Sequence, residues 1–283
     1  MQALAWLSEP LGYPFMVRGL LASIMVGVIC PVIGSYMILR GLSFFGDALS
    51  HAILPGIVLT YLLDWPLAVG ALIAGVLAAL AIGFISQRGN VQEDTAIGIV
   101  FAGSFALGVA LISTVSGYAV DLAHILFGDV LGVTASDLRW TLALSVAVLG
   151  IVFLFFKELL VLTFDPTLAL VLRLPARFLR YLLFVLIAVT IVVSLQTVGI
   201  SLMLAMLVTP AAAAQLLTRR LPWMMLAAAL IGVACNVTGL YLSYYVNVAS
   251  GPAMVLVATA VFAIVFLLAP QRGMLWRRLR PAT

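Results

Sequence analysis

Charged residues are scarce in this sequence: Asp, Glu, Lys and Arg together make up 8% of its 283 residues, whereas 65% are hydrophobic. The mean hydropathy of +1.28 lies far outside the range of soluble domains, in which about 25% of residues are charged. This shortage excludes a water-soluble enzyme or a nucleic-acid-binding domain. The net charge of +4 therefore indicates no nucleic-acid partner, and the placement of the charges matters more than their sum.

Cysteines and catalytic motifs are also few. The two cysteines, Cys30 and Cys235, lie in separate apolar runs without CxxC spacing, so we interpret them as packed thiols. The sequence contains no HExxH and no GxSxG motif. The spaced glycines Gly98, Gly103 and Gly108 lack the lysine of a phosphate-binding loop. We therefore expect neither catalysis nor a cofactor in this chain.

What the sequence does contain is a series of apolar runs, each close to the roughly 20 residues that cross a bilayer. They predict an all-α, polytopic membrane protein with eight to nine transmembrane helices and no sizeable extramembrane domain. The expected spans are residues 16–39, 42–63, 67–85, 96–113, 138–156, 181–195, 198–217, 223–245 and 252–268.

The connecting segments complete a single transmembrane domain over residues 1–283. Residues 1–15 contain Glu9 and two prolines and lack a basic stretch, so we expect an interfacial lead-in, not a cleavable signal peptide. Residues 86–94 are expected to form a solvated loop, residues 122–133 a short interfacial or re-entrant helix, and residues 270–283 a basic cytoplasmic tail.

The basic residues predict the orientation of the chain. If the N-terminus lies outside and the chain crosses nine times, all but two of the 14 Lys and Arg residues face the cytoplasm. The exceptions are Arg18 and Arg139. This distribution follows the positive-inside rule and predicts a multi-pass protein of the bacterial cytoplasmic (inner) membrane, although eight spans remain compatible with one re-entrant segment.

One acid, Asp47, falls inside an expected span, and His51 follows it four residues later. At that spacing both side chains project from one face of a helix, and Ser43 and Ser50 are expected to widen the same polar stripe. Pro55 cannot donate a hydrogen bond to the backbone carbonyl of His51, so we expect that carbonyl to be free. The opposite face is expected to be apolar, with these residues: Phe44, Phe45, Leu49 and Ile53.

An acid within a membrane helix costs on the order of 2.5–3.5 kcal/mol and is by default functional or paired. One interpretation is that Asp47 and His51 only bond each other or cap the helix. The other is a metal-handling role, because a carboxylate and an imidazole suit Mn²⁺, Fe²⁺ or Zn²⁺, whereas Cu⁺ prefers sulfur. Two ligands are too few for a closed site, as expected for an ion that must be released.

Residues 162–175 contain a second signal. Asp165 followed by Pro166 is typical of a helix start, and the apolar helix of about nine residues must end before Pro175. It is too short to cross a membrane and lies on the basic side. It is either an interfacial helix or a docking element for a cytoplasmic protein.

Two further features have simpler interpretations. His124 lies in a less apolar outer segment with Asp121 and Asp129, and we interpret it mainly as a surface histidine, with a role in admitting metal as the alternative. Thr209-Pro210 with the four alanines that follow it predicts close helix packing, with a part in a gate as the alternative.

These motifs together resemble the permease subunits of the metal-ion ATP-binding-cassette importers, which carry manganese, zinc or iron(II) into bacteria. The resemblance covers essentially the whole chain, and residues 9–16 are more similar to manganese and iron members than to zinc members. It is carried by residues 39–56 (LRGLSFFGDALSHAILPG), Phe127-Gly128-Asp129-Val130-Leu131, Phe164-Asp165-Pro166, and Val198-Gly199-Ile200 leading to Thr209-Pro210-Ala211-Ala212.

The resemblance implies a type II importer permease bundle that forms a homodimer, with two cytoplasmic ATPase subunits and an extracytoplasmic metal-binding lipoprotein or periplasmic protein as partners. The conserved acid and histidine of the family fall on Asp47 and His51, so the metal is the substrate of the transporter. The cytoplasmic coupling helix falls on residues 162–175. Its ATPase-coupling residues are Asp165, Pro166, Leu170 and Arg173, and the family often has a glycine near the end of this helix, where this chain has Arg173-Leu174-Pro175.

Three other functions remain as alternatives. A secondary transporter could use Asp47 and His51 as a proton relay, and it would need no ATPase. An ATP-driven importer could carry a chelated metal, although an acid and a histidine favour bare ions. An intramembrane metalloenzyme is disfavoured, because two ligands without a general base make a poor catalytic site.

Overall fold

The computed structural model describes residues 9–89, 91–114 and 130–269, and these residues form helices without any strand. The helices are α2 (Pro14–Leu39), α3 (Phe45–Ala52), α4 (Leu54–Leu62), α5 (Leu67–Arg88), α6 (Glu93–Ile112), α8 (Ala135–Leu154), α9 (Phe156–Phe164), α10 (Pro166–Val171), α11 (Ala176–Val198), α12 (Ile200–Leu217), α13 (Leu221–Val246) and α14 (Ser250–Leu268), with 3₁₀ turns η1 (Pro10–Gly12) and η2 (Val130–Gly132).

The described part of the chain contains nine helical segments that are long and apolar enough to cross a membrane, if α3 and α4 are counted as one. The all-α, polytopic class that the sequence predicts is therefore confirmed, with nine spans. Most of the expected re-entrant helix, the expected basic tail and His124 lie outside the described residues, as do residues 1–8 of the lead-in.

The chain forms two compact units. The first comprises Met1–Ile38, Phe127–Ala143 and Thr197–Thr283, and the second comprises Leu39–Leu126 and Leu144–Gln196. Each unit therefore brings together segments that are distant in sequence, and each has its own packing.

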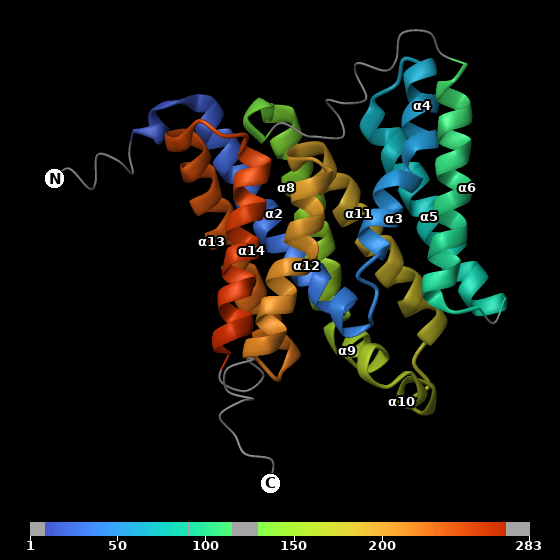
Figure 1. Cartoon of the computed structure of the whole chain (residues 1–283). Coiled ribbons are helices and arrows are strands. Elements are labelled where there is room, and N and C mark those ends of the chain that lie inside the picture. Colours follow the sequence, from blue (N-terminus) through green and yellow to red (C-terminus); the bar gives the residue numbers. More distant parts are fainter. Residues whose placement is uncertain (1–8, 90, 115–129, 270–283) are drawn as a thin grey trace. The chain divides into compact units, whose positions relative to one another are not determined.

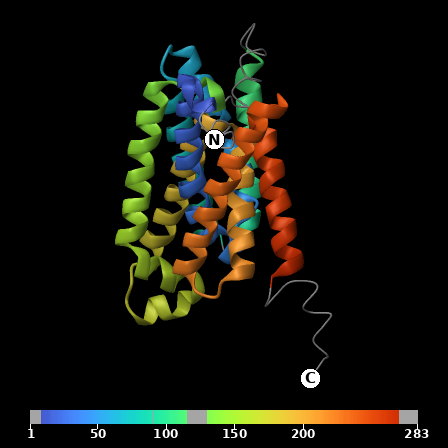
Figure 2. The same ribbon diagram turned by 90° about the vertical axis from the view of Figure 1, so that its left-hand side faces the viewer.

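In the first unit, α12, α13 and α14 pack against one another and lie side by side in Figures 1 and 2, where they are drawn in orange to red. Helix α2 packs closely on α13 at Gly27. A Cβ atom at this position would lie only 3.1 Å from the backbone of Gly232. The buried Asn236 side chain donates a hydrogen bond of 2.7 Å to the Ser23 carbonyl oxygen. In α12, Pro210 and three of the alanines that follow it are buried, so the packing interpretation of that stretch is confirmed.

In the second unit, α3 and α4 pack against α5 and α6 (Figure 1). Gly56 of α4 faces Gly70 of α5, and a Cβ atom on either glycine would meet the carbonyl oxygen of the other. Because glycine has no side chain, Gly56 and Gly70 permit this close helix contact. Phe45 of α3 stacks on Phe184 of α11 with ring centroids 5.2 Å apart.

Helices α9 and α10 form a short elbow at the lower end of this unit in Figure 1. Leu162 of α9, Ala169 of α10 and Leu179 of α11 form a buried apolar cluster that holds the elbow against α11. One face of the elbow is therefore packed against α11, and the opposite face is its outer face.

Candidate metal centre

The second span is broken in the middle. Helix α3 ends at Ala52, α4 begins at Leu54, and Pro55 lies in the first turn of α4. Pro55 supports this break because it lacks an amide hydrogen and its ring clashes with a continuing helix. The break lies at Ile53, two residues after His51, so α3 is an eight-residue helix that carries both candidate ligands.

Asp47 and His51 lie on one face of α3, as their spacing predicts. The Nε2 atom of His51 is 3.7 Å from the Oδ1 atom of Asp47, and the two side chains are 33% and 39% exposed, respectively. This distance exceeds the roughly 2.7–3.2 Å of an N–H···O hydrogen bond. The two groups are therefore close enough to share an ion but are not joined to each other by a hydrogen bond.

Aromatic rings from α6 frame the His51 side chain. Phe105 meets the imidazole edge-on at a centroid distance of 5.8 Å, and Phe101 lies at 5.9 Å. Phe44 continues this group by an edge contact with Phe101 and is 53% exposed, so our placement of Phe44 on the apolar face opposite Asp47 is wrong. Residues 44, 47 and 51 are three and four residues apart, and this spacing places them on one helix face.

Two of the expected supporting groups are engaged elsewhere. The Ser50 side chain is buried, and its hydroxyl donates a 2.7 Å hydrogen bond to the backbone carbonyl of Asp47, so it does not extend the polar stripe. The backbone carbonyl of His51 is not free either, because it accepts a hydrogen bond from the amide of Ile53. Ser43 lies before α3 and is exposed. At the helix break, the Ile53 amide donates the hydrogen bond to the His51 carbonyl that Pro55 cannot donate.

The described residues contain no group of three or more His, Cys, Asp or Glu side chains that could hold a metal ion. Asp47 and His51 therefore offer two ligands, whereas transition-metal and hard divalent ions take about four to eight. Water or another chain would have to supply the others. An arrangement of this kind can bind an ion transiently and release it.

The α9–α10 elbow begins as the sequence predicts. The Asp165 carboxylate accepts hydrogen bonds of 2.9 Å from the amides of Thr167 and Leu168, and Pro166 occupies the first turn of α10. The helix ends at Val171, earlier than expected, and Arg173 has a left-handed backbone with φ of 54°. That conformation is one that glycine adopts more readily than other residues.

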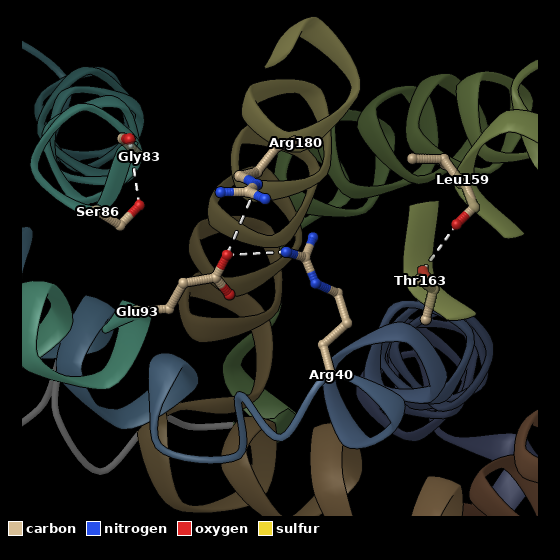
Figure 3. A network of polar contacts seen from close by, with 7 residues as sticks. All are labelled: Arg40, Gly83, Ser86, Glu93, Leu159, Thr163 and Arg180. Carbon is tan, nitrogen blue, oxygen red and sulfur yellow. Dashed lines mark hydrogen bonds and ion pairs between the residues drawn. The ribbon is translucent and has the colours of Figure 1, made fainter. Parts of the chain in front are cut away.

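A partly buried ionic cluster joins the start of α6 to α11 and to the segment between α2 and α3 (Figure 3). The Arg40 guanidinium donates a 2.9 Å hydrogen bond to Glu93 Oε1, and the Nε atom of Arg180 lies 3.7 Å from the same oxygen. Burial lowers the pKa of Arg40, and Glu93 counteracts this effect. We expected Glu93 in a solvated loop, but it is the first residue of α6. The sequence around Glu93 gives no indication that its partner is Arg40, which lies 53 positions earlier.

The fold is that of a multi-pass membrane protein, with two candidate ion ligands on one of its spans. The family model of the ABC 3 transport family matches residues 12–269, and the chain belongs to that family. This match and the relatives described below confirm the resemblance to the permeases of metal-ion ATP-binding-cassette importers, which are multi-pass proteins of the bacterial inner membrane.

Curated relatives cover nearly the whole chain. The manganese transport system membrane protein MntC of Halalkalibacterium halodurans is 49% identical over 267 residues, which are 94% of this chain and 91% of that protein. The chelated iron transport system membrane protein YfeD of Yersinia pestis is 40% identical over 277 residues, 98% of this chain and 93% of that protein.

Two solved structures have the same fold. PsaBC from Streptococcus pneumoniae in complex with Fab matches with a TM-score of 0.84 and 38% identity over 98% of this chain and 100% of that chain. An inward-facing conformation of a putative metal-chelate type ABC transporter matches with a TM-score of 0.72 at 14% identity, over 88% of this chain and 85% of that chain. The second likeness concerns the fold alone.

Proposed function

We propose that this chain is the membrane permease of an ATP-driven importer that moves a divalent transition metal ion, principally Mn²⁺, into the cytoplasm. The observation that carries the proposal is the 49% identity, over 94% of the chain, to a protein named as a manganese transport membrane protein. The chemistry of the Asp47 and His51 pair supports it, because a carboxylate with an imidazole suits Mn²⁺, Fe²⁺ and Zn²⁺.

Asp47 and His51 are the proposed metal ligands on the transport path. Both side chains are about one-third exposed within a helical segment that is otherwise largely buried, so they face a space that this chain does not fill. A second copy of the permease would bring a second Asp47, and two carboxylates would neutralise one divalent ion. That neutralisation lowers the cost of moving charge through a low-dielectric path.

The elbow of α9 and α10 is the proposed coupling element for two cytoplasmic ATPase subunits. Asp165 and Pro166 fix its start, whereas Leu170 and Leu172 of its outer face are 67% and 54% exposed. Exposed leucines on a well-packed elbow are typical of a surface that another protein covers. ATP binding by the partner would move this element, and Asp47 and His51 would face the outside and the cytoplasm in turn.

An extracytoplasmic metal-binding protein would deliver the ion to the opposite side of the membrane. With that protein the proposed assembly consists of a permease homodimer, two ATPases and the delivery protein. The metal is the cargo, and we propose no resident cofactor for this chain.

The test is uptake of radiolabelled Mn²⁺, Fe²⁺ and Zn²⁺ into proteoliposomes that contain the complete transporter, with and without ATP. The proposal predicts ATP-dependent uptake in which Mn²⁺ is preferred. Uptake driven by a proton gradient without ATP would instead support the secondary transporter. Because one relative is named for chelated iron, the assay includes a chelated Fe³⁺ arm, and preference for the chelate would overturn the bare-ion proposal.

A further inference from the structure

A groove of about 410 Å³ lies between the end of α5, the α9–α10 elbow and the first turns of α11. We call it the basic groove. Its apolar wall consists of Leu162, Pro166, Leu170 and Ala176. Leu170 is 67% exposed, so much of this wall is left uncovered by the chain itself.

The polar lining of the basic groove offers donors for an anion. Arg177 and Arg180 contribute guanidinium groups, Gln87 contributes an amide, and none of the lining residues is an acid. The Gln87 side-chain nitrogen is buried and has no hydrogen-bond partner among the described residues. Such a donor is costly to leave unpaired, so the groove favours a ligand that accepts hydrogen bonds.

Arg180 connects the basic groove to the partly buried ionic cluster of Figure 3. Its Nε atom lies 3.7 Å from Glu93 Oε1, whereas Arg40 approaches the same oxygen to 2.9 Å. The Arg180 side chain is 28% exposed and that of Arg40 is 9% exposed. Glu93 is therefore held mainly by Arg40, and Arg180 can turn part of its guanidinium towards a second carboxylate.

We propose that the basic groove receives an acidic side chain of the cytoplasmic ATPase subunit, which binds to Arg177 and Arg180 while the exposed leucines of α10 contact an apolar surface beside it. This rests on the proposed function, because it assigns a binding chemistry to the same docking element. Arginine suits such a contact, since its planar guanidinium binds a carboxylate through two hydrogen bonds.

The combination of charge and apolar surface favours a protein partner over an anionic lipid. The groove is continuous with the elbow through Pro166 and Leu170, so one protein surface can cover the guanidinium groups and the apolar wall together.

A carboxylate in the basic groove would act on α6, the helix whose aromatic side chains contact His51. Glu93 is the first residue of α6, and the same helix carries Phe101 and Phe105, which contact the His51 ring. Occupancy of the groove is thus linked through Arg180 and Glu93 to the helix that frames His51. This is a physical connection between ATPase docking and the metal centre.

The test measures the affinity of the purified cognate ATPase for the permease in nanodiscs of phosphatidylcholine, with the variants Arg177→Glu and Arg177→Gln. The control is Arg220→Glu, which makes the same charge change at an exposed arginine directly before α13, outside the elbow and the groove. We expect Arg177→Glu to weaken binding at least about tenfold, Arg177→Gln to weaken it less, and Arg220→Glu to change it little. A lysine in place of the interacting acid on the ATPase should restore the affinity of Arg177→Glu.

Equal affinities of Arg177→Glu and Arg220→Glu would overturn the proposal. So would a result in which Arg177→Glu leaves ATPase binding unchanged but weakens binding of phosphatidylglycerol, because the occupant would then be a lipid headgroup. ATP-dependent Mn²⁺ uptake by the unaltered complex is measured in parallel. If it is intact while the groove variants have no effect, only the groove proposal fails and the proposed function stands.

Discussion

The Nε2 atom of His51 lies 3.7 Å from the Oδ1 atom of Asp47, one helical turn away on an eight-residue helix that ends directly before a proline-induced break. Each side chain is about one-third exposed, so neither is committed to the interior of the chain. The proposed transport chemistry depends on this pair, and the remaining features of the second unit hold α3 in place.

Replacing His51 with Ala should change the rate of metal uptake or the preference among Mn²⁺, Fe²⁺ and Zn²⁺, because the only nitrogen ligand of the pair is lost. The fold should persist, since the ring contacts Phe101 and Phe105 but is partly exposed. The measurement is competitive uptake of the three ions in proteoliposomes. Unchanged rates and unchanged preference would show that His51 is not a ligand.

Replacing Glu93 with Gln should destabilise the protein, because the buried Arg40 would keep its charge and lose its carboxylate. Leaving a partly buried polar group without its partner typically costs about 1–3 kcal/mol. Asp94→Asn is the matched control, since Asp94 lies in the same first turn of α6 but is exposed. Thermal melting in detergent should show a clear loss for the Gln variant only, and equal melting temperatures would contradict the assigned role of Glu93.

A methyl group between α4 and α5 should destabilise their packing. A Cβ atom at Gly56 would meet the Gly70 carbonyl and the Ala74 side chain, so Gly56→Ala forces the helices apart at a cost of about 1–3 kcal/mol. Gly98→Ala serves as the control, because nothing lies near its Cβ position and alanine favours a helix. A melting temperature for Gly56→Ala at or above that of Gly98→Ala would refute the close contact.

The end of the α9–α10 elbow should respond to backbone preference at Arg173. This residue has a φ of 54°, which costs a non-glycine residue about 1–2 kcal/mol. Arg173→Gly should therefore raise the free energy of unfolding, whereas Arg173→Val should lower it, because a β-branched residue fits this conformation poorly. Denaturant titration of the two variants checks the order, and the reverse order would exclude a left-handed residue there.

Much of the fold follows from the sequence because the bilayer imposes a length and a composition on each helix. The start of α10 was predictable for a similar local reason, since Asp165 and Pro166 act within one turn. The pair of Asp47 and His51 was predictable from helical spacing alone.

The parts that sequence reasoning missed depend on contacts between distant residues. The partnership of Arg40 with Glu93 requires the packing of the second unit, and so does the placement of Phe44 beside Phe101. Local backbone detail also escaped prediction, because the Ile53 amide satisfies the His51 carbonyl only once the helix has broken. The spacing of residues within one helix predicts which of them share a face, but it does not predict contacts with other helices.

The most direct test of the account is ATP-dependent uptake of radiolabelled Mn²⁺ by proteoliposomes that contain the Asp47→Asn permease. The control is Asp64→Asn, which removes an exposed acid at the turn between α4 and α5, where the φ of 52° is one that asparagine tolerates. The account predicts that Asp47→Asn folds and assembles with its partners but does not transport Mn²⁺, while Asp64→Asn transports at the normal rate. Normal Mn²⁺ uptake by Asp47→Asn would contradict it.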